Sequence, residues 1–226
     1  MKIAIVYIYP EAGGNGHFER ALNFVQSYHY APPMIEHDTV IICNGGKAND
    51  ETKYLFESLP NCTFLEHDDS GFDIGGYQLA AKSYPCDLMV FLGGNSYIRG
   101  QGWLRRMANV FQDHGDNLYG CTGNQGDMRF GVFPHVRTTG FWCSPKLIND
   151  HPLRCTDNSL RYPYEHGANG LTSWVIRTGR QALIVGWNEI RDVYSCDSMP
   201  GGFHRDNQQN ILVGDRLTAP PYYHCP

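Results

Sequence analysis

The first half of the chain alternates between patterns typical of buried strands and of amphipathic helices. Residues 3–9 are almost continuously apolar, as in a strand covered on both faces of a parallel sheet. After a glycine-rich turn, apolar residues recur at helical spacing over 18–25. The alternation continues with strands predicted over 39–43, 63–66 and 88–92, and with helices predicted over 52–59, 77–84 and 103–111. This order predicts an α/β fold whose mostly parallel central sheet is flanked by helices and binds ligands at the carboxyl ends of its strands.

The second half of the chain is less regular. Strand patterns recur at 118–122, 139–143 and 182–187, a helical pattern covers 171–178, and glycine, proline and aromatic residues are dense. We find no linker, repeat or low-complexity segment between the halves. We therefore expect a single domain over residues 1–226. A regular half would cover about 1–115, and an irregular half about 116–226.

Composition and charge exclude several classes of protein. The 226 residues are 42% hydrophobic, which is enough for a substantial core. A net charge of −5 gives no general electrostatic reason to bind nucleic acid or an anionic membrane. No run of about 18 apolar residues is present, and the N-terminal segment lacks the features of a signal peptide. We expect a cytoplasmic protein with at most peripheral membrane association and no nucleic-acid partner.

The eight cysteines are widely scattered, and no two of them form a Cys-x-x-Cys pair. This spacing argues against a zinc ribbon or a thioredoxin-like motif. Several cysteines lie within apolar runs, as Cys43 does, so we expect reduced thiols in the core.

Two loops are candidates for ligand binding. The glycine-rich turn 13–16 follows the first strand and precedes a helix, where backbone amides could meet a phosphate, although a plain flexible turn explains it equally well. It matches neither the Rossmann nor the P-loop fingerprint. The segment 71–77 is more informative. Asp73 stands at a predicted helix start, and Gly75 and Gly76 cost roughly 1 kcal/mol each in a helix relative to alanine. We expect something to approach that backbone closely.

The segment 69–77, Asp-Ser-Gly-Phe-Asp-Ile-Gly-Gly-Tyr, resembles a motif of a known enzyme family. It is similar to the Asn-x-Gly-x-Asp-Ile-Gly-Gly motif of glycosyltransferases related to rhamnan-synthesis proteins, which have the GT-A fold and act in cell-surface polysaccharide synthesis. The resemblance extends to further segments at 88–92, 102–104, 165–174 and 201–208.

The resemblance implies transfer of a sugar from a nucleotide-sugar donor, UDP- or dTDP-linked, to a glycan or lipid-linked acceptor. The nucleotide-binding half would be about 1–115, and the acceptor-binding and catalytic half about 116–226. Asp73 would contact the nucleoside or the donor sugar, while Tyr7, Tyr9 and Asn44 would line the base pocket. The other residues expected at the donor site are Gly76, Gly94, Asn95 and Arg205.

The chain departs from the family at the metal motif. Where the family has Asp-x-Asp, whose carboxylates hold a divalent cation, this chain has Gly93-Gly94-Asn95. Three interpretations remain open. Metal-independent catalysis, with Arg205 stabilising the diphosphate, is the one we favour. Alternatively, Mn²⁺ or Mg²⁺ is held by His204 together with the diphosphate, or the domain binds without catalysing.

An inverting transfer also needs a base for the acceptor hydroxyl. Glu165 precedes a predicted helix, and its position is similar to that of the acidic base of inverting GT-A enzymes. An ordinary capping or exposed carboxylate would explain it as well, and Asp127 is a weaker rival.

Two other functions remain open. One is a catalytically degenerate module that binds nucleotide-sugars or glycans. The other is a sugar-nucleotide pyrophosphorylase, although such enzymes have a Gly-x-Gly-x-Arg loop and the turn 13–16 is followed by His17.

Overall fold

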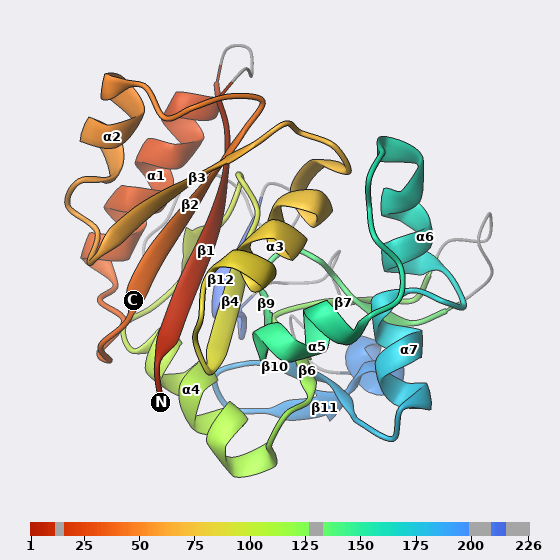
Figure 1. Cartoon of the computed structure of the whole chain (residues 1–226). Coiled ribbons are helices and arrows are strands. Elements are labelled where there is room, and N and C mark those ends of the chain that lie inside the picture. The colour runs from red at the N-terminus through yellow and green to blue at the C-terminus, as the bar shows by residue number, and fades with distance from the viewer. Residues whose placement is uncertain (12–15, 127–132, 199–208, 216–226) are drawn as a thin grey trace.

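The computed structural model describes residues 1–11, 16–126, 133–198 and 209–215, and its centre is one eight-stranded sheet (Figure 1). The strands lie in the order β11-β10-β6-β9-β4-β1-β2-β3. Their bounds are β1 (Ile3–Pro10), β2 (Asp38–Asn44), β3 (Cys62–His67), β4 (Leu88–Leu92), β6 (Leu118–Gly120), β9 (Phe141–Cys143), β10 (Ala182–Val185) and β11 (Ile190–Asp192).

Six strands of the sheet share one direction, since β3, β2, β1 and β4 pair in parallel, β6 pairs in parallel with β10, and β9 lies antiparallel between β4 and β6. The edge strand β11 is antiparallel to β10. The mostly parallel α/β sheet predicted from the sequence is confirmed. The sheet contains strands from both sides of residue 115, so the two halves share one continuous hydrogen-bonded layer.

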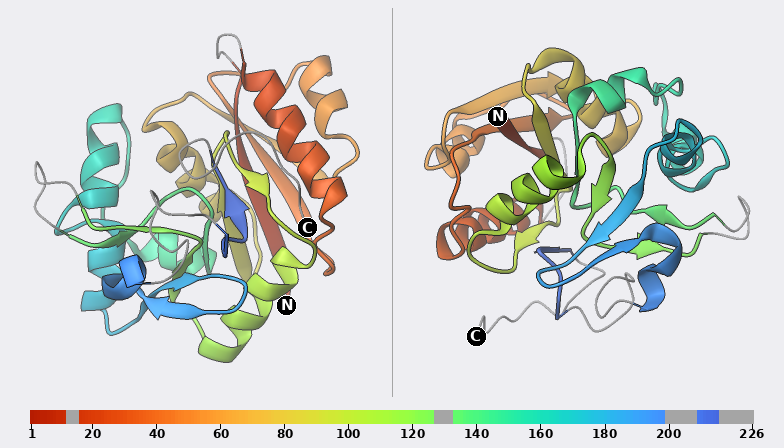
Figure 2. Two further views of the ribbon diagram at one scale, coloured as in Figure 1. Left: turned by 180° about the vertical axis from the view of Figure 1, so that it is seen from behind. Right: turned by 90° about the horizontal axis from the view of Figure 1, so that it is seen from below.

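Helices cover both faces of the sheet, which gives two separate apolar cores (Figure 2). On one face lie α1 (His17–Tyr30), α2 (Asp50–Phe56) and α4 (Trp103–His114). On the other lie α3 (Phe72–Ser83), α5 (Pro145–Asp150), α6 (Arg161–His166) and α7 (Leu171–Arg177). Along β1, Ile5 and Tyr7 enter the first core, whereas Val6 and Ile8 enter the second, because strand side chains alternate between faces. The continuous apolar run of this strand follows from burial on both sides.

Several short elements were not predicted. The ribbon β5 (Tyr97–Ile98) pairs with β12 (Val213–Gly214), and β7 (Gly123–Asn124) pairs with β8 (His135–Val136). Two 3₁₀ turns, η2 (Asn158–Leu160) and η3 (Val193–Ser198), complete the second half. Two-residue strands carry too few side chains to show a period, so the sequence pattern does not reveal them.

The two glycines of α3 have a packing reason. A Cβ on Gly76 would lie 2.9 Å from Ile42 Cγ2 and 3.0 Å from Ile8 Cδ1, and a Cβ on Gly75 would lie 2.0 Å from the Ser70 carbonyl oxygen. The close approach expected at this backbone is therefore made by the protein itself. The contacts of Gly76 place α3 directly against β1 and β2.

The described cysteines agree with the expectation of reduced thiols. The seven cysteines in the described part of the chain are free thiols, and Cys43 is completely buried. No helix among the described residues is both long and apolar enough to cross a membrane.

Candidate functional site

A cavity of about 420 Å³ opens where β1 and β2 end and α3 begins. Four of the residues predicted for the donor site line it. Other lining residues come from β1, from the start of α1 and from α6. The full lining is Ile8, Pro10, His17, Asn44, Asp69, Phe72, Asp73, Gly94, Asn95 and Arg161. The cavity thus lies at the carboxyl edge of the parallel strands, where α/β sheets bind their ligands.

The chain enters α3 through a backbone that is unusual for its residue types. Asp69 and Phe72 have positive φ angles of 66° and 52°, and Gly71 between them has 74°. Such angles are rare for residues with a side chain and cost free energy, so they concentrate at functional sites. Gly71, rather than Asp73, is the N-cap, and Asp73 Oδ1 accepts a hydrogen bond of 3.2 Å from the Ile74 amide. The turn thereby directs Phe72 and Asp73 into the cavity wall.

Asp73 and Arg161 form an ion pair across the cavity. Arg161 Nε lies 3.7 Å from Asp73 Oδ1, with the two side chains 38% and 21% exposed. Burial raises the pKa of Asp73 to about 6, because desolvation and the negative charge of Glu165 outweigh the attraction of Arg161. The Arg161 guanidinium also lies 5.6 Å from the centre of the Phe72 ring. The wall therefore offers one cation and one carboxyl group that titrates just below neutral pH.

Tyr7 and Tyr9 lie behind the cavity rather than in its wall. The Tyr7 ring is fully buried and stacks on Phe24 at 4.3 Å, while its hydroxyl donates a 3.0 Å hydrogen bond to the Gly94 carbonyl. The Tyr9 ring packs edge-on against Phe56. Both side chains face the core beneath α1 and α2. Tyr7 therefore acts on the cavity indirectly, by holding the backbone of Gly94.

Asn44 is nearly buried at the end of β2, and it lies in the cavity wall. Its Oδ1 is 2.8 Å from His67 Nδ1, so the ring at the end of the neighbouring strand fixes the orientation of the amide. This contact makes Asn44 a preorganised polar group at the carboxyl edge.

The segment that replaces the acidic metal motif also borders the cavity. Gly93-Gly94-Asn95 contains no carboxylate, and its amide oxygen, Asn95 Oδ1, is buried without a hydrogen-bond partner among the described residues. A hard divalent cation prefers several oxygen ligands with negative charge, so this segment does not fit the family's metal. The other predicted residues with a role in phosphate, metal or base chemistry, His204, Arg205 and Asp127, lie outside the described residues, as does most of the turn 13–16.

Glu165 lies on α6, one helical turn after Arg161, and is held by its neighbours. Its Oε1 accepts hydrogen bonds from the Thr138 amide at 3.1 Å and the Thr138 hydroxyl at 3.0 Å, and its Oε2 lies 3.3 Å from His166 Nε2. Burial alone would raise the pKa of Glu165, but His166, His135 and the Thr138 amide outweigh it and lower the pKa to about 2. A carboxylate with so low a pKa is a weak base at neutral pH.

Arg161 is a charged residue of the cavity wall that the sequence analysis did not predict. The sequence offered one signal for Arg161, which is that it precedes Glu165 by four residues. Residues four apart lie on one face of a helix. That signal required knowing that the polar segment 161–166 is helical, whereas Pro163 and the aromatic residues around it obscure any helical period.

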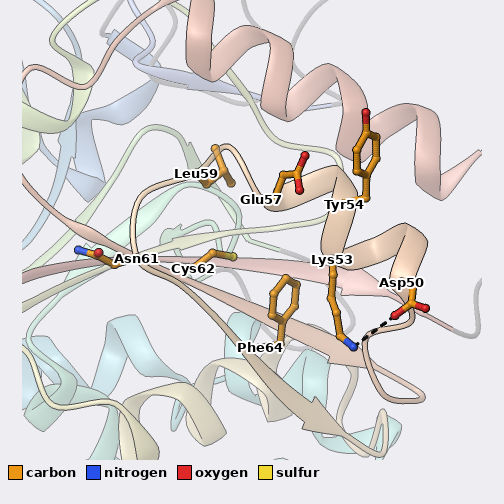
Figure 3. A pocket seen from close by; sticks show the side chains of 8 residues that line it. All are labelled: Asp50, Lys53, Tyr54, Glu57, Leu59, Asn61, Cys62 and Phe64. Carbon is orange, nitrogen blue, oxygen red and sulfur yellow. Dashed lines mark ion pairs between the residues drawn. The ribbon is translucent and has the colours of Figure 1, made fainter.

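A second hollow, of about 620 Å³, lies between α2 and the edge strand β3 (Figure 3). Its lining comprises Asp50, Lys53, Tyr54, Glu57, Leu59, Asn61, Cys62 and Phe64, with Lys53 Nζ 3.6 Å from Asp50 Oδ1. None of the residues predicted for binding or catalysis lies here. It shares no lining residue with the cavity, and it includes Cys62 at the start of β3.

Comparisons with known proteins bear on the fold. No protein-family model and no curated protein matches the sequence. Among solved structures, mouse xyloside xylosyltransferase 1 is similar over 98% of this chain and 100% of that chain, with a TM-score of 0.55 and 10% identity.

Two other solved structures are weaker matches. TarS of S. aureus, residues 1–349 crystallised with UDP-GlcNAc, matches over 72% of this chain with a TM-score of 0.47 and 13% identity. This chain covers 53% of that TarS chain, about half its length. A putative glucose-1-phosphate thymidylyltransferase from Bacillus anthracis matches over 78% of this chain and 84% of that chain, with a TM-score of 0.49 and 11% identity.

The likeness to the mouse enzyme spans nearly the whole of both chains, and it agrees with the strand order and helix layers described above. The chain has a GT-A-like α/β fold.

Proposed function

We propose that the chain is a glycosyltransferase that binds a nucleotide-sugar donor in the 420 Å³ cavity. The observation that carries the proposal is the meeting of Asn44, Asp73 and Arg161 at the carboxyl edge of a GT-A-like sheet. This edge is where α/β folds bind nucleotides, and the cavity has the size of a small-molecule site.

Each polar group has a role suited to part of such a donor. Asn44 and Asp73 offer hydrogen bonds to nucleoside or sugar hydroxyls. Arg161 supplies a planar cation that matches the geometry of phosphate oxygens. Arg205 stays a prediction from the sequence, as a second cation for the diphosphate.

The proposed reaction breaks the bond between the anomeric carbon and the diphosphate oxygen and forms a bond from that carbon to an acceptor hydroxyl oxygen, whose proton passes to a base. Negative charge grows on the departing diphosphate, and Arg161 would stabilise it. With no carboxylate at 93–95, we retain metal-independent transfer as the preferred form, with Mn²⁺ or Mg²⁺ near His204 as the alternative.

The contacts of Glu165 lower its pKa, which argues against Glu165 as the base at neutral pH. Its catalytic role stays a prediction. Asp73, in the cavity wall, has a pKa of about 6.

A binding and turnover screen tests the proposal. UDP, GDP, dTDP and CMP are titrated into the protein by calorimetry, and the corresponding nucleotide-sugars are incubated with and without Mn²⁺ while free nucleotide is measured. We expect a UDP- or dTDP-linked donor to bind and to be hydrolysed slowly without metal. Failure of every nucleotide to bind would reject the proposal.

The same screen separates two other functions. The absence of carboxylates at 93–95 is also what a module that binds without catalysing would have, and such a module would show binding without hydrolysis or transfer in either metal condition. A pyrophosphorylase would instead release pyrophosphate from a nucleoside triphosphate and a sugar phosphate. The glycan or lipid-linked acceptor, the link to polysaccharide synthesis and the cytoplasmic location belong to the proposal and need cellular assays.

A further inference from the structure

A buried cluster of His135, Glu165 and His166 lies outside the set of residues that line the cavity. His135 comes from β8, whereas Glu165 and His166 end α6, so the fold joins segments about thirty residues apart. One nitrogen or carboxylate oxygen of each residue lies within 4.8 Å of the others, and the centres of the two imidazole rings are 4.3 Å apart. The histidines are 1% and 8% exposed.

His135 has a buried ring nitrogen with a free lone pair. Its Nδ1 lies 2.9 Å from the Phe133 carbonyl oxygen, which can only accept, so Nδ1 carries the hydrogen. In the neutral ring Nε2 is then unprotonated, and it has no hydrogen-bond partner among the described residues. A buried nitrogen without a partner is costly, and a hydrogen bond from the other ring nitrogen to a carbonyl is the usual support of a metal-binding histidine.

Glu165 is oriented in a similar way. Thr138 occupies Oε1 with two hydrogen bonds, from its amide and its hydroxyl. The other oxygen, Oε2, lies 3.3 Å from His166 Nε2. Ligand atoms bound to one tetrahedral zinc ion at 2.0–2.1 Å are separated by about 3.3–3.4 Å, so this pair already has the required spacing.

We propose that His135, Glu165 and His166 bind one Zn²⁺ ion, with a fourth position open to water or to a further ligand. Two imidazoles and one carboxylate form a known ligand set for zinc, whereas Mg²⁺ and Mn²⁺ favour sites made mainly of oxygen. The alternative is a hydrogen-bonded His-Glu-His network without metal, which accounts for the contacts of Glu165 but leaves His135 Nε2 without a partner.

The ion would connect β8 to the end of α6. Since α6 also carries Arg161 into the cavity, the ion would hold that side chain in place without touching the donor. Glu165 would then be a zinc ligand rather than the catalytic base. This inference goes beyond the proposed glycosyl transfer, because it holds whether or not the cavity binds a nucleotide.

Metal titration without nucleotide tests the site. Chelator-treated protein is titrated with Zn²⁺ by calorimetry, and with Co²⁺ while the visible d–d absorption is recorded. We expect one equivalent of either metal to bind, with a tetrahedral Co²⁺ spectrum that lacks thiolate charge-transfer bands. Such bands would assign the metal to cysteines and overturn the proposal, as would absence of binding.

Variants locate the metal on the cluster. Glu165→Gln and His166→Gln should each weaken Zn²⁺ binding at least about 100-fold, and Thr138→Ala, which removes only a supporting hydroxyl, about 10-fold. His29→Gln, on the exposed surface of α1, is the matched control and should bind Zn²⁺ like the wild type. Circular dichroism confirms folding of each variant. Unchanged affinity in folded Glu165→Gln and Thr138→Ala would overturn the proposal.

Discussion

At the scale of single residues, burial and a neighbouring cation shift the pKa of Asp73 in opposite directions. Its carboxyl group lies in the cavity wall, where burial raises its pKa from 3.8 to about 6 even though Arg161 lies 3.7 Å away. A carboxyl kept where its charged form is disfavoured lowers stability at neutral pH. Such a residue is better explained by ligand binding than by a contribution to the fold.

The first prediction concerns the pH dependence contributed by Asp73. Between about pH 4 and pH 6 the folded protein holds more protons at this site than the unfolded chain, so the free energy of unfolding falls as pH rises through that window. Asp73→Asn should remove this loss and be more stable than the wild type at pH 7.5, by up to about 3 kcal/mol for a rise of about two pKa units. Urea unfolding of both proteins at pH 5 and pH 7.5 measures the difference. Equal pH dependence in the two proteins would show that Asp73 does not titrate as described.

A second prediction separates that stability effect from binding. The same Asp73→Asn substitution should weaken binding of the preferred nucleotide-sugar about 10-fold, because a carboxylate that accepts hydrogen bonds from the ligand contributes more than a neutral amide. Calorimetry at pH 7.5 measures it. A variant that is more stable and binds the donor as well as the wild type would remove Asp73 from the site.

Residues at strand ends could be predicted from the sequence, while residues placed by tertiary contacts could not. Asn44 and Gly94 follow continuous apolar runs, so their place at the carboxyl edge follows from the strand pattern alone. Tyr7 was expected in the base pocket, but its ring lies in the core beneath α1 and α2. A strand buried on both faces has no polar side, so its pattern does not reveal which residues face the ligand. Arg161 reaches the cavity from the second half of the chain.

At the scale of elements, the turn into α3 determines where the cavity wall lies. Gly71 has a positive φ of 74°, and a Cβ there would lie 2.2 Å from the Cys155 carbonyl oxygen. Two constraints therefore act on this glycine, one on its backbone angle and one on the space around it. The sequence indicated that the turn was special, but the glycine-rich motif does not identify Cys155 as the neighbour.

A third prediction compares two glycines that differ in only one of these constraints. Gly179, in the turn that ends α7, also has a positive φ, of 83°, yet nothing lies within 4 Å of a Cβ at that position. Gly179→Ala should cost about 1 kcal/mol of unfolding free energy, from backbone strain alone. Gly71→Ala should cost at least about 2 kcal/mol more, because the methyl group meets a backbone atom. Chemical denaturation checks both values, and equal costs would show that the contact with Cys155 is not rigid.

At the scale of the whole molecule, one sheet joins the two halves of the chain. β9, from the second half, pairs with β4 on one side and with β6 on the other. The β–α alternation predicted the strands β1 to β4 well, including Leu88–Leu92. It could not predict that an antiparallel three-residue strand would enter the sheet beside β4. That pairing depends on long-range contacts, which local periodicity does not record.

A fourth prediction follows from this continuity. Residues 1–115 expressed alone should not fold cooperatively, because β4 would become an exposed apolar edge strand and the core beneath it would open. The full chain should unfold in one transition. Thermal unfolding followed by circular dichroism compares the two proteins. A sharp transition in the 1–115 fragment would show that the nucleotide half is an independent domain.

The central claim is that the cavity at the carboxyl edge binds the nucleotide diphosphate of a sugar donor. The most direct measurement is calorimetric titration of the best-binding nucleoside diphosphate into the wild type, Arg161→Gln and Lys53→Gln. The two variants lose the same charge, but Lys53 lines the separate hollow beside α2 (Figure 3). We predict that Arg161→Gln weakens binding about 10- to 100-fold and that Lys53→Gln binds like the wild type. Equal affinities in all three proteins, or equal losses in both variants, would contradict the account.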